Sequence, residues 1–175
     1  PWQKAQLPQG WGPVLDQFGM IFVTPARSGN EEDIISRREP LALIAAQNVM
    51  AQYPVDPAQV FVGGMSGGAR MALRLALAYP DLFHGALLNS GSDVIGTITE
   101  PLPSASLFRQ FQTGTRLLYV TGDHDGANVE SEMRSKRSMQ EWCVSDVASI
   151  KMPFTGHEVA TPAIVGLVVR EHVLA

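Results

Sequence analysis

Short apolar runs alternate with longer helix-forming stretches along this chain. The runs lie at 20–24, 59–62, 85–90, 116–121 and 149–152. Each is bounded by glycine, proline or polar residues, which is typical of buried strands. The stretches at 33–53, 69–79, 128–144 and from about 161 carry helix formers or apolar residues at helical spacing. This alternation predicts an α/β fold with a mostly parallel sheet flanked by helices. No repeat or linker divides the sequence, so we expect residues 1–175 to form one domain.

The remaining segments are predicted to be irregular. Residues 2–13 indicate loop and short helix, and residues 93–112 indicate a loop-rich connection. The second segment would suit a short lid over a substrate, although a plain connection fits it equally. Asp33 and Asn128 are expected to cap the helices that follow them, because their side chains can accept backbone N–H groups.

The helix predicted over 128–144 should have one wet side. Its charged residues, Glu132 among them, are expected on that side. Cys143 is the single cysteine and is predicted on the same helix as a structural free thiol. No internal disulfide can therefore form.

The run from Val60 to Met71 organises the candidate chemistry. It predicts a strand that passes through a tight turn into a helix, with Ser66 at the turn and Gly64 and Gly68 two residues to either side. A serine held in such a turn leaves no room for side chains at those positions. The following helix would aim N–H groups and its positive dipole end at developing negative charge. This pattern arises by chance in a glycine-rich chain, but its strand-turn-helix context indicates a nucleophile for acyl transfer.

A base and a carboxylate are available after later strand ends. His157 follows the last predicted strand and can accept the Ser66 proton and return it to a leaving group. Asp125 is the expected partner that orients this imidazole, with Asp123 as the competing carboxylate. Both follow a strand that should end at the same edge of the sheet as Ser66.

The other histidines carry weaker signals. His84 begins a predicted strand and suits packing or capping, His124 should be exposed between two aspartates, and His172 lies in the last predicted helix. A metal site at 123–125 with His157 is an alternative, because carboxylates and imidazoles suit zinc or manganese. That spacing matches no metal motif, so we expect neither a metal nor another cofactor.

Composition narrows the partners. The chain has 45% hydrophobic and 17% charged residues and a net charge of −4, and its only basic cluster is Arg37-Arg38. These features argue against nucleic acid or an anionic membrane surface as partner. No apolar run approaches the roughly 20 residues of a membrane-spanning helix. The chain opens at Pro1 without a signal-peptide pattern, and the sequence does not indicate a cellular compartment.

Four segments together resemble one superfamily. They are Val55-Asp56-Pro57, Gly63 to Ala72, Tyr79-Pro80-Asp81-Leu82-Phe83 and Asn89-Ser90-Gly91. The combination is similar to α/β-hydrolases, and within them to the polyhydroxybutyrate depolymerase-like and feruloyl esterase-like carboxylesterases. The resemblance covers most of the chain from about Gly19. It implies that Ser66 is the nucleophile, that Asp125 in Gly122-Asp123-His124-Asp125 is the acid, and that His157 in Gly156-His157 is the base.

The chain departs from this family at its front. Members carry earlier strands and a His-Gly loop that supplies one of two oxyanion N–H donors, and nothing before Gly19 matches them. The N–H of Gly67 can still donate. Losing one such donor typically costs about 10²–10³-fold in rate. We therefore expect an N-terminally truncated hydrolase fold whose missing segment, or a partner such as a second copy, covers the exposed sheet edge.

These observations predict a serine hydrolase that cleaves a small-molecule or polymeric carboxylic ester through an acyl-enzyme. Ser66 would attack, His157 would move the proton, Asp125 would orient His157, and the Gly67 N–H would hold the oxyanion. A non-catalytic binding module with this fold is one alternative. A serine peptidase with the same residues is another.

Overall fold

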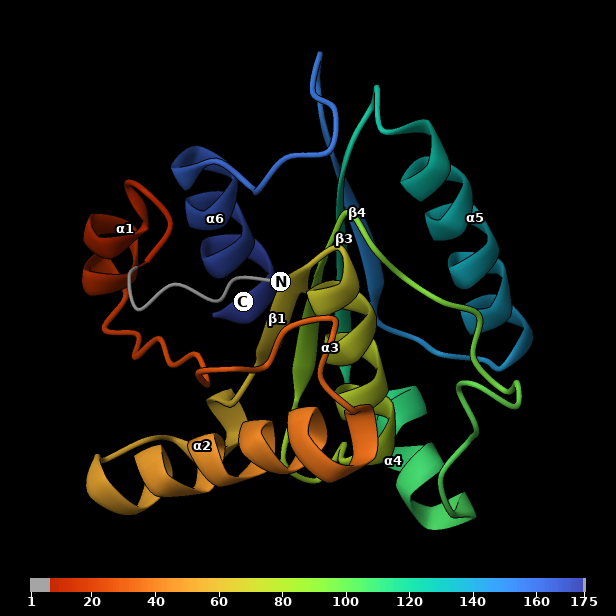
Figure 1. The fold of residues 1–175 in the computed structure, drawn as a ribbon, viewed down its shortest axis with the longest axis horizontal. Coiled ribbons are helices and arrows are strands. Elements are labelled where there is room, and N and C mark those ends of the chain that lie inside the picture. Colours follow the sequence, from red (N-terminus) through yellow and green to blue (C-terminus); the bar gives the residue numbers. More distant parts are fainter. Residues whose placement is uncertain (1–6, 175) are drawn as a thin grey trace.

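The structure, a computed structural model, describes residues 7–174 and contains a four-stranded parallel sheet. Its strands are β1 (Val62–Met65), β2 (Gly85–Asn89), β3 (Arg116–Gly122) and β4 (Val147–Met152), in that spatial order. Because every strand runs in the same direction, the carboxyl ends meet at one edge of the sheet (Figure 1). The predicted α/β class with a parallel sheet is confirmed.

Helices cover both faces of the sheet (Figure 1). One face carries α3 (Gly67–Ala78), α4 (Ala105–Gly114) and α5 (Gly126–Glu141), and the other carries α1 (Trp11–Gln17) and α6 (Pro162–Val168). The remaining long helix, α2 (Glu39–Gln52), packs against α3. Short helical turns lie at Ile34–Arg38, Pro57–Gln59 and Val169–Val173. Of the irregular segment expected at 2–13, residues 2–6 lie outside the described part.

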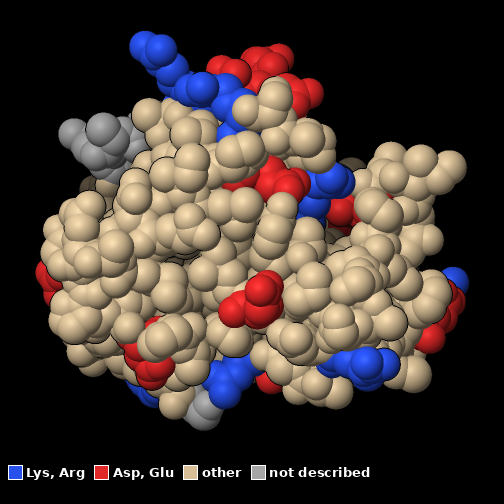
Figure 2. Space-filling model, turned by 90° about the horizontal axis from the view of Figure 1, so that it is seen from below, with Lys and Arg blue, Asp and Glu red and all other residues tan. Residues whose placement is uncertain are grey.

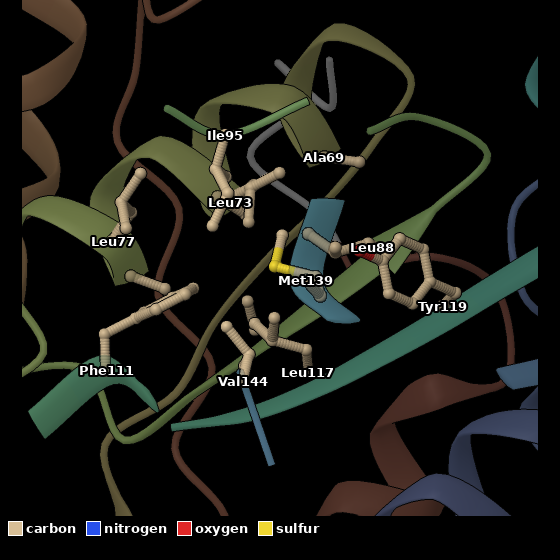
Figure 3. Close-up of a cluster of buried hydrophobic side chains, with 13 residues drawn as sticks. Ala69, Leu73, Leu77, Leu88, Ile95, Phe111, Leu117, Tyr119, Met139 and Val144 are labelled. Atoms are coloured by element: carbon tan, nitrogen blue, oxygen red, sulfur yellow. The ribbon is translucent and has the colours of Figure 1, made fainter. Parts of the chain in front are cut away.

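The central strand β3 divides the core. Leu117 and Tyr119 join the cluster under α3, α4 and α5, which Figure 3 shows in close-up, while Leu118 and Val120 face α1 and α6. Successive side chains of a strand point to opposite faces, so a strand buried on both sides must be apolar at every position. This requirement explains why the run at 116–121 reads as continuously hydrophobic.

The strand predicted at 20–24 does not form. These residues are irregular, and Ile21, Phe22 and Val23 are 50%, 41% and 48% exposed. A strand exists only where a neighbour satisfies its backbone hydrogen bonds, and no strand in residues 7–174 pairs with this run. The prediction was wrong because an apolar pattern carries no information about the presence of a partner.

The helix predicted over 33–53 is divided in two. Asp33 caps a wide π-helical turn at Ile34–Arg38, where its Oδ1 accepts the Ser36 N–H at 2.7 Å, and α2 then runs from Glu39 with a proline in its first turn. The expected cap is therefore confirmed. The wide turn places the last of its residues, Arg38, under the first turn of α3, where its guanidinium meets the Gly67 carbonyl.

The loop-rich segment at 93–112 is half helix. α4 begins after Ser104, and it brings Phe111, which is fully buried, into the core against the Phe108 ring at 6.1 Å. The second half of this segment is therefore part of the core rather than a lid. The two aromatic residues stand three positions apart, which puts them on one helix face.

Helix α5 also differs from its prediction. It starts at Gly126, so Asp125 takes the capping position and Asn128 lies inside the first turn. Glu132 is only 3% exposed rather than wet, because its carboxylate pairs with Lys151 of β4 at 2.8 Å. Cys143 lies beyond the helix end and is exposed. Helical spacing located the helix, whereas the neighbouring strand decided which of its charges is covered.

The face of the molecule at the bottom of Figure 1, where α2 and α4 lie, carries scattered charges. Figure 2 shows Lys and Arg atoms in separate places on this face, interspersed with acidic groups. Within residues 7–174, no helix is both long enough and apolar enough to cross a bilayer.

Candidate active site

Ser66 occupies a strained turn between β1 and α3. Its backbone has φ 57° and ψ −121°, a region that residues with a side chain rarely adopt. The turn is held from below, where the Ser66 N–H donates to the Asn89 carbonyl at 2.8 Å, and from above, where the Ala69 N–H donates to the Ser66 carbonyl at 3.0 Å. Such strain persists only where the surroundings enforce it. The turn therefore fixes the hydroxyl at the head of a helix, at the carboxyl edge of the sheet.

Two glycines make this turn possible. A Cβ on Gly64 would lie 2.3 Å from the Gly68 carbonyl carbon, and one on Gly91 would lie 2.3 Å from the Ser66 carbonyl oxygen. Carbon atoms do not approach this closely, so any side chain at either position would push the turn apart. The steric reason expected for Gly64 holds in the structure.

The expected acid and base lie together. Nδ1 of His157 is 2.7 Å from Oδ2 of Asp125, which is buried, whereas the His157 side chain is 44% exposed. Asn128 donates to both Asp125 oxygens, at 3.0 and 2.9 Å. Burial raises the pKa of Asp125, but hydrogen bonds from His157, Asn128 and Ser90 outweigh it, so the pKa lies below its ordinary value. The carboxylate is thereby kept ionised next to the imidazole.

The competing carboxylate lies elsewhere. Asp123 Oδ1 accepts the Thr155 N–H at 3.1 Å and sits 3.9 Å from His124 Nε2. Hydrogen bonds from the backbone of Phe154 and Thr155 lower the pKa of Asp123. Its role in this geometry is to shape the loop before His157. Of the two aspartates, Asp125 is the one whose carboxylate contacts the imidazole.

Asn89 ties the two parts of the site together, and the sequence analysis assigned it no role. Its backbone carbonyl accepts the Ser66 N–H, its side-chain oxygen accepts the Ala160 N–H at 2.7 Å, and its side-chain nitrogen donates to the Glu158 carbonyl at 3.1 Å. These bonds hold the residues on both sides of His157. A buried asparagine at a strand end, next to the apolar run of β2, is the signal that could have identified it.

Gly122 lets the same loop approach the sheet. A Cβ there would lie 2.2 Å from the Thr155 carbonyl oxygen and 2.3 Å from that of Gly156. The absence of a side chain allows β3 to end directly beneath the residues that precede His157. The backbone of His124 completes this junction by donating to the Thr155 carbonyl at 2.9 Å.

Ser66 and His157 lie on the same edge without a direct bond. No hydrogen bond joins their side chains in the described part of the chain. Ser66 is half-buried beside an open cleft of about 400 Å³, while His157 stands on the exposed loop. Gly67 begins α3 immediately after the turn, so its N–H is one of the first-turn groups without an intrahelical partner. It is thus free to meet an anion at the helix terminus.

The other histidines lie as the sequence suggested. His84 is half-buried at the start of β2, His124 is 66% exposed at its side chain, and His172 lies in the terminal turn. Among residues 7–174, no group of three or more His, Cys, Asp or Glu side chains could hold a metal ion. The metal alternative at 123–125 therefore finds no support in the described structure.

Comparison with known proteins follows this geometry. No family model matches the chain. The poly(3-hydroxybutyrate) depolymerase of Ralstonia pickettii is 30% identical over 46% of this chain and 20% of its own length. The poly(3-hydroxyalkanoate) depolymerase C of Paucimonas lemoignei is 34% identical over 44% of this chain and 22% of its own length. The matched part therefore spans about a fifth of these relatives.

A solved structure supports the same fold. Esterase PE8 superposes with a TM-score of 0.56 over 83% of this chain and 68% of its own, at 21% identity. At that identity the likeness shows the fold alone, and it confirms the expected α/β-hydrolase architecture. Sequence and fold agree, and the chain belongs to the α/β-hydrolase superfamily, among its carboxylesterase-like members.

Proposed function

We propose that this protein is a serine hydrolase that cleaves carboxylic esters through an acyl-enzyme. The observation that carries the proposal is the strained turn of Ser66 at the head of α3, with the Asp125–His157 pair at the same edge of the sheet. Strain of this kind is costly, and it is characteristic of functional sites. A nucleophile with an oriented base beside a helix N-terminus suits acyl transfer.

In the proposed reaction, each residue has one role. Ser66 Oγ attacks the ester carbonyl while His157 Nε2 takes the hydroxyl proton, and the carbonyl oxygen becomes an oxyanion held by the Gly67 N–H. The tetrahedral adduct collapses, the C–O bond to the alcohol breaks, and His157 returns the proton to the departing alcohol. Water then attacks the acyl-enzyme with the same proton transfers and releases the acid. Asp125 accepts the Nδ1–H of His157 and stabilises the imidazolium in both halves.

The substrate is proposed to be a carboxylic ester, small or polymeric. The two relatives are depolymerases of polyhydroxyalkanoates by name, which supports an ester of this general kind. The cleft beside Ser66 is open to solvent rather than enclosed, which would also admit the end of a longer chain.

Labelling with a fluorophosphonate probe tests the proposal directly. The purified chain should be labelled at Ser66, and 4-nitrophenyl acetate should be hydrolysed; both should be lost in Ser66→Ala, and turnover should be lost in His157→Ala. Ser106→Ala, an exposed serine of α4, serves as the matched control and should leave both unchanged. A folded protein that is neither labelled nor active would contradict the proposal.

One observation favours a second candidate, a non-catalytic binding module with this fold. Within residues 7–174 the Ser66 and His157 side chains share no hydrogen bond, and the second oxyanion donor is not assigned. The labelling experiment separates the two, because only the hydrolase reacts with the probe. Amide substrates beside esters would distinguish the serine peptidase alternative, since both reactions pass through the same acyl-enzyme.

A further inference from the structure

The cleft beside Ser66 is lined by three arginines. Arg38, Arg70 and Arg74 border it together with Ser66 and Gly67, and the acidic residues Asp93 and Glu100 lie on the same walls. A cleft of about 400 Å³ is large enough for a small organic molecule. What distinguishes the three cations is whether each has an acidic partner.

Two of them do. Arg70 pairs with the Asp93 carboxylate and also donates to the Ser92 carbonyl at 2.9 Å. Arg74 lies 3.4 Å from Glu39 and 3.9 Å from Glu100. These two guanidinium groups are thus neutralised within the protein and serve to link α3 to its neighbours.

Arg38 has no such partner. It is 7% exposed, and it appears in none of the ion pairs between residues 7 and 174. Its Nη2 donates to the Gly67 carbonyl at 3.3 Å, and its Nε, which is buried, has no hydrogen-bond partner in the described structure. A buried guanidinium stays charged, so an unpaired one is costly unless an anion completes it.

The position of Arg38 is fixed by its own segment. It ends the wide turn that Asp33 caps, and its backbone N–H donates to the Asp33 carbonyl at 3.0 Å. Its guanidinium is thereby held against Gly67, the residue next to Ser66. An anionic group bound there would lie only a few bonds from a carbonyl at the Ser66 hydroxyl.

We propose that Arg38 forms an anion subsite in this cleft, and that the esters cleaved at Ser66 carry a carboxylate that this subsite binds. The inference rests on the proposed function for its catalytic part, whereas the anion site itself can be tested without catalysis. Arg38 is here a specificity residue, because a guanidinium binds a carboxylate in a bidentate, charge-assisted manner.

Matched ester pairs test the preference. Mono(4-nitrophenyl) adipate is compared with 4-nitrophenyl hexanoate, which places the charge on the acyl side. The second pair, 3-acetoxybutanoate and sec-butyl acetate, places it on the alcohol side. In at least one pair the anionic ester should have a kcat/KM on the order of 10-fold higher, mainly through KM, and salt should reduce this ratio.

Arginine variants assign the preference to one residue. Arg38→Gln should remove the ratio between anionic and neutral esters, and Arg38→Lys should restore part of it. Arg137→Gln, an exposed arginine of α5, is the matched control and should leave the ratio unchanged. If Arg38 only supported the turn through its bond to Gly67, the variants would slow both members of each pair equally. That result, or equal rates for both members in the native protein, would overturn the inference.

A binding measurement separates the subsite from catalysis. Calorimetric titration of Ser66→Ala with adipate should show binding that the double variant Ser66→Ala/Arg38→Gln lacks. Binding without hydrolysis of any ester would leave the anion site standing and contradict the proposed function. Hydrolysis of the neutral esters without adipate binding or an anionic preference would do the reverse.

Discussion

The side-chain oxygen of Asn89 accepts a hydrogen bond at 2.7 Å from the backbone N–H of Ala160, 71 residues further along the chain. The same side chain donates to the Glu158 carbonyl, and its own carbonyl receives the Ser66 N–H. One buried residue at the end of β2 therefore positions both the turn of Ser66 and the loop of His157.

Replacing Asn89 by alanine should separate these two parts. We expect Asn89→Ala to lower kcat by about 10–100-fold with little change in KM, because the loop of His157 loses its anchor, and to reduce stability by about 1–3 kcal/mol through the unpaired groups it leaves. Hydrogen exchange at residues 156–161 should accelerate. Ser135→Ala, which removes the buried 2.8 Å bond to Tyr119 far from the site, is the control and should lower the melting temperature while leaving kcat unchanged. Unaltered exchange in the loop would refute this role of Asn89.

Asn128 should act on the ionisation of Asp125. Removing its two hydrogen bonds in Asn128→Ala should raise the pKa of Asp125, since burial then acts with less opposition. A carboxyl whose folded pKa is depressed contributes stability that is present above its unfolded pKa and lost as pH falls through the folded value. In the variant this contribution should be smaller at neutral pH and disappear at a higher pH.

Carboxyl chemical shifts of labelled aspartates against pH provide the measurement for Asn128. The acid limb of the kcat profile should also lie at higher pH in the variant, whereas a purely structural loss would leave its midpoint in place. Asn48→Ala on the exposed side of α2 is the control. An Asp125 pKa that is identical in both proteins would rule out this effect.

Gly122 should tolerate no side chain. Gly122→Ala places a Cβ within 2.2 Å of the Thr155 carbonyl oxygen, so the loop of His157 must move. We expect a loss of about 1–3 kcal/mol of unfolding free energy, as for other overpacked sites, together with loss of ester turnover. Gly114→Ala, where nothing lies within 4 Å, should be neutral or stabilising. Chemical denaturation of both variants checks this contrast, which fails if the two behave alike.

Glu100 should make stability depend on pH. Burial is the main reason that its pKa is raised to about 7, with Arg74 opposing it and Asp93 and Glu39 adding to it. Because the folded protein then binds a proton more tightly than the unfolded chain, stability should fall as pH rises from about 4.5 to about 7. Glu100→Gln should remove this slope. Melting temperatures at pH 5 and pH 8 should show a larger gain for the variant at pH 8, and an equal gain at both would contradict the assignment.

The order of elements could be read from the sequence because it depends on local spacing. The run at 116–121 is apolar throughout since both its faces are covered, and Ser66 with its flanking glycines obeys a steric rule that acts within five residues. The loop that carries His157 was located because it follows an apolar run. The expectation that residues 1–175 form one domain, and the roles given to Ser66, Asp125, His157 and Gly67, remain predictions that the experiments above address.

Other features depended on contacts between distant residues. Residues 20–24 have the pattern of a strand, but no strand in the described chain pairs with them. Glu132 looked solvent-facing until Lys151 of β4 was placed beside it, and Asn89 gained its role only when the chain around Ala160 came within hydrogen-bonding distance. The sequence by itself determined the α/β class and the strained serine turn, because these follow from side-chain period and local sterics. Only the tertiary structure decided which carboxylate meets His157 and which arginine lacks a partner, because pairing between groups depends on distances that the order of residues does not contain.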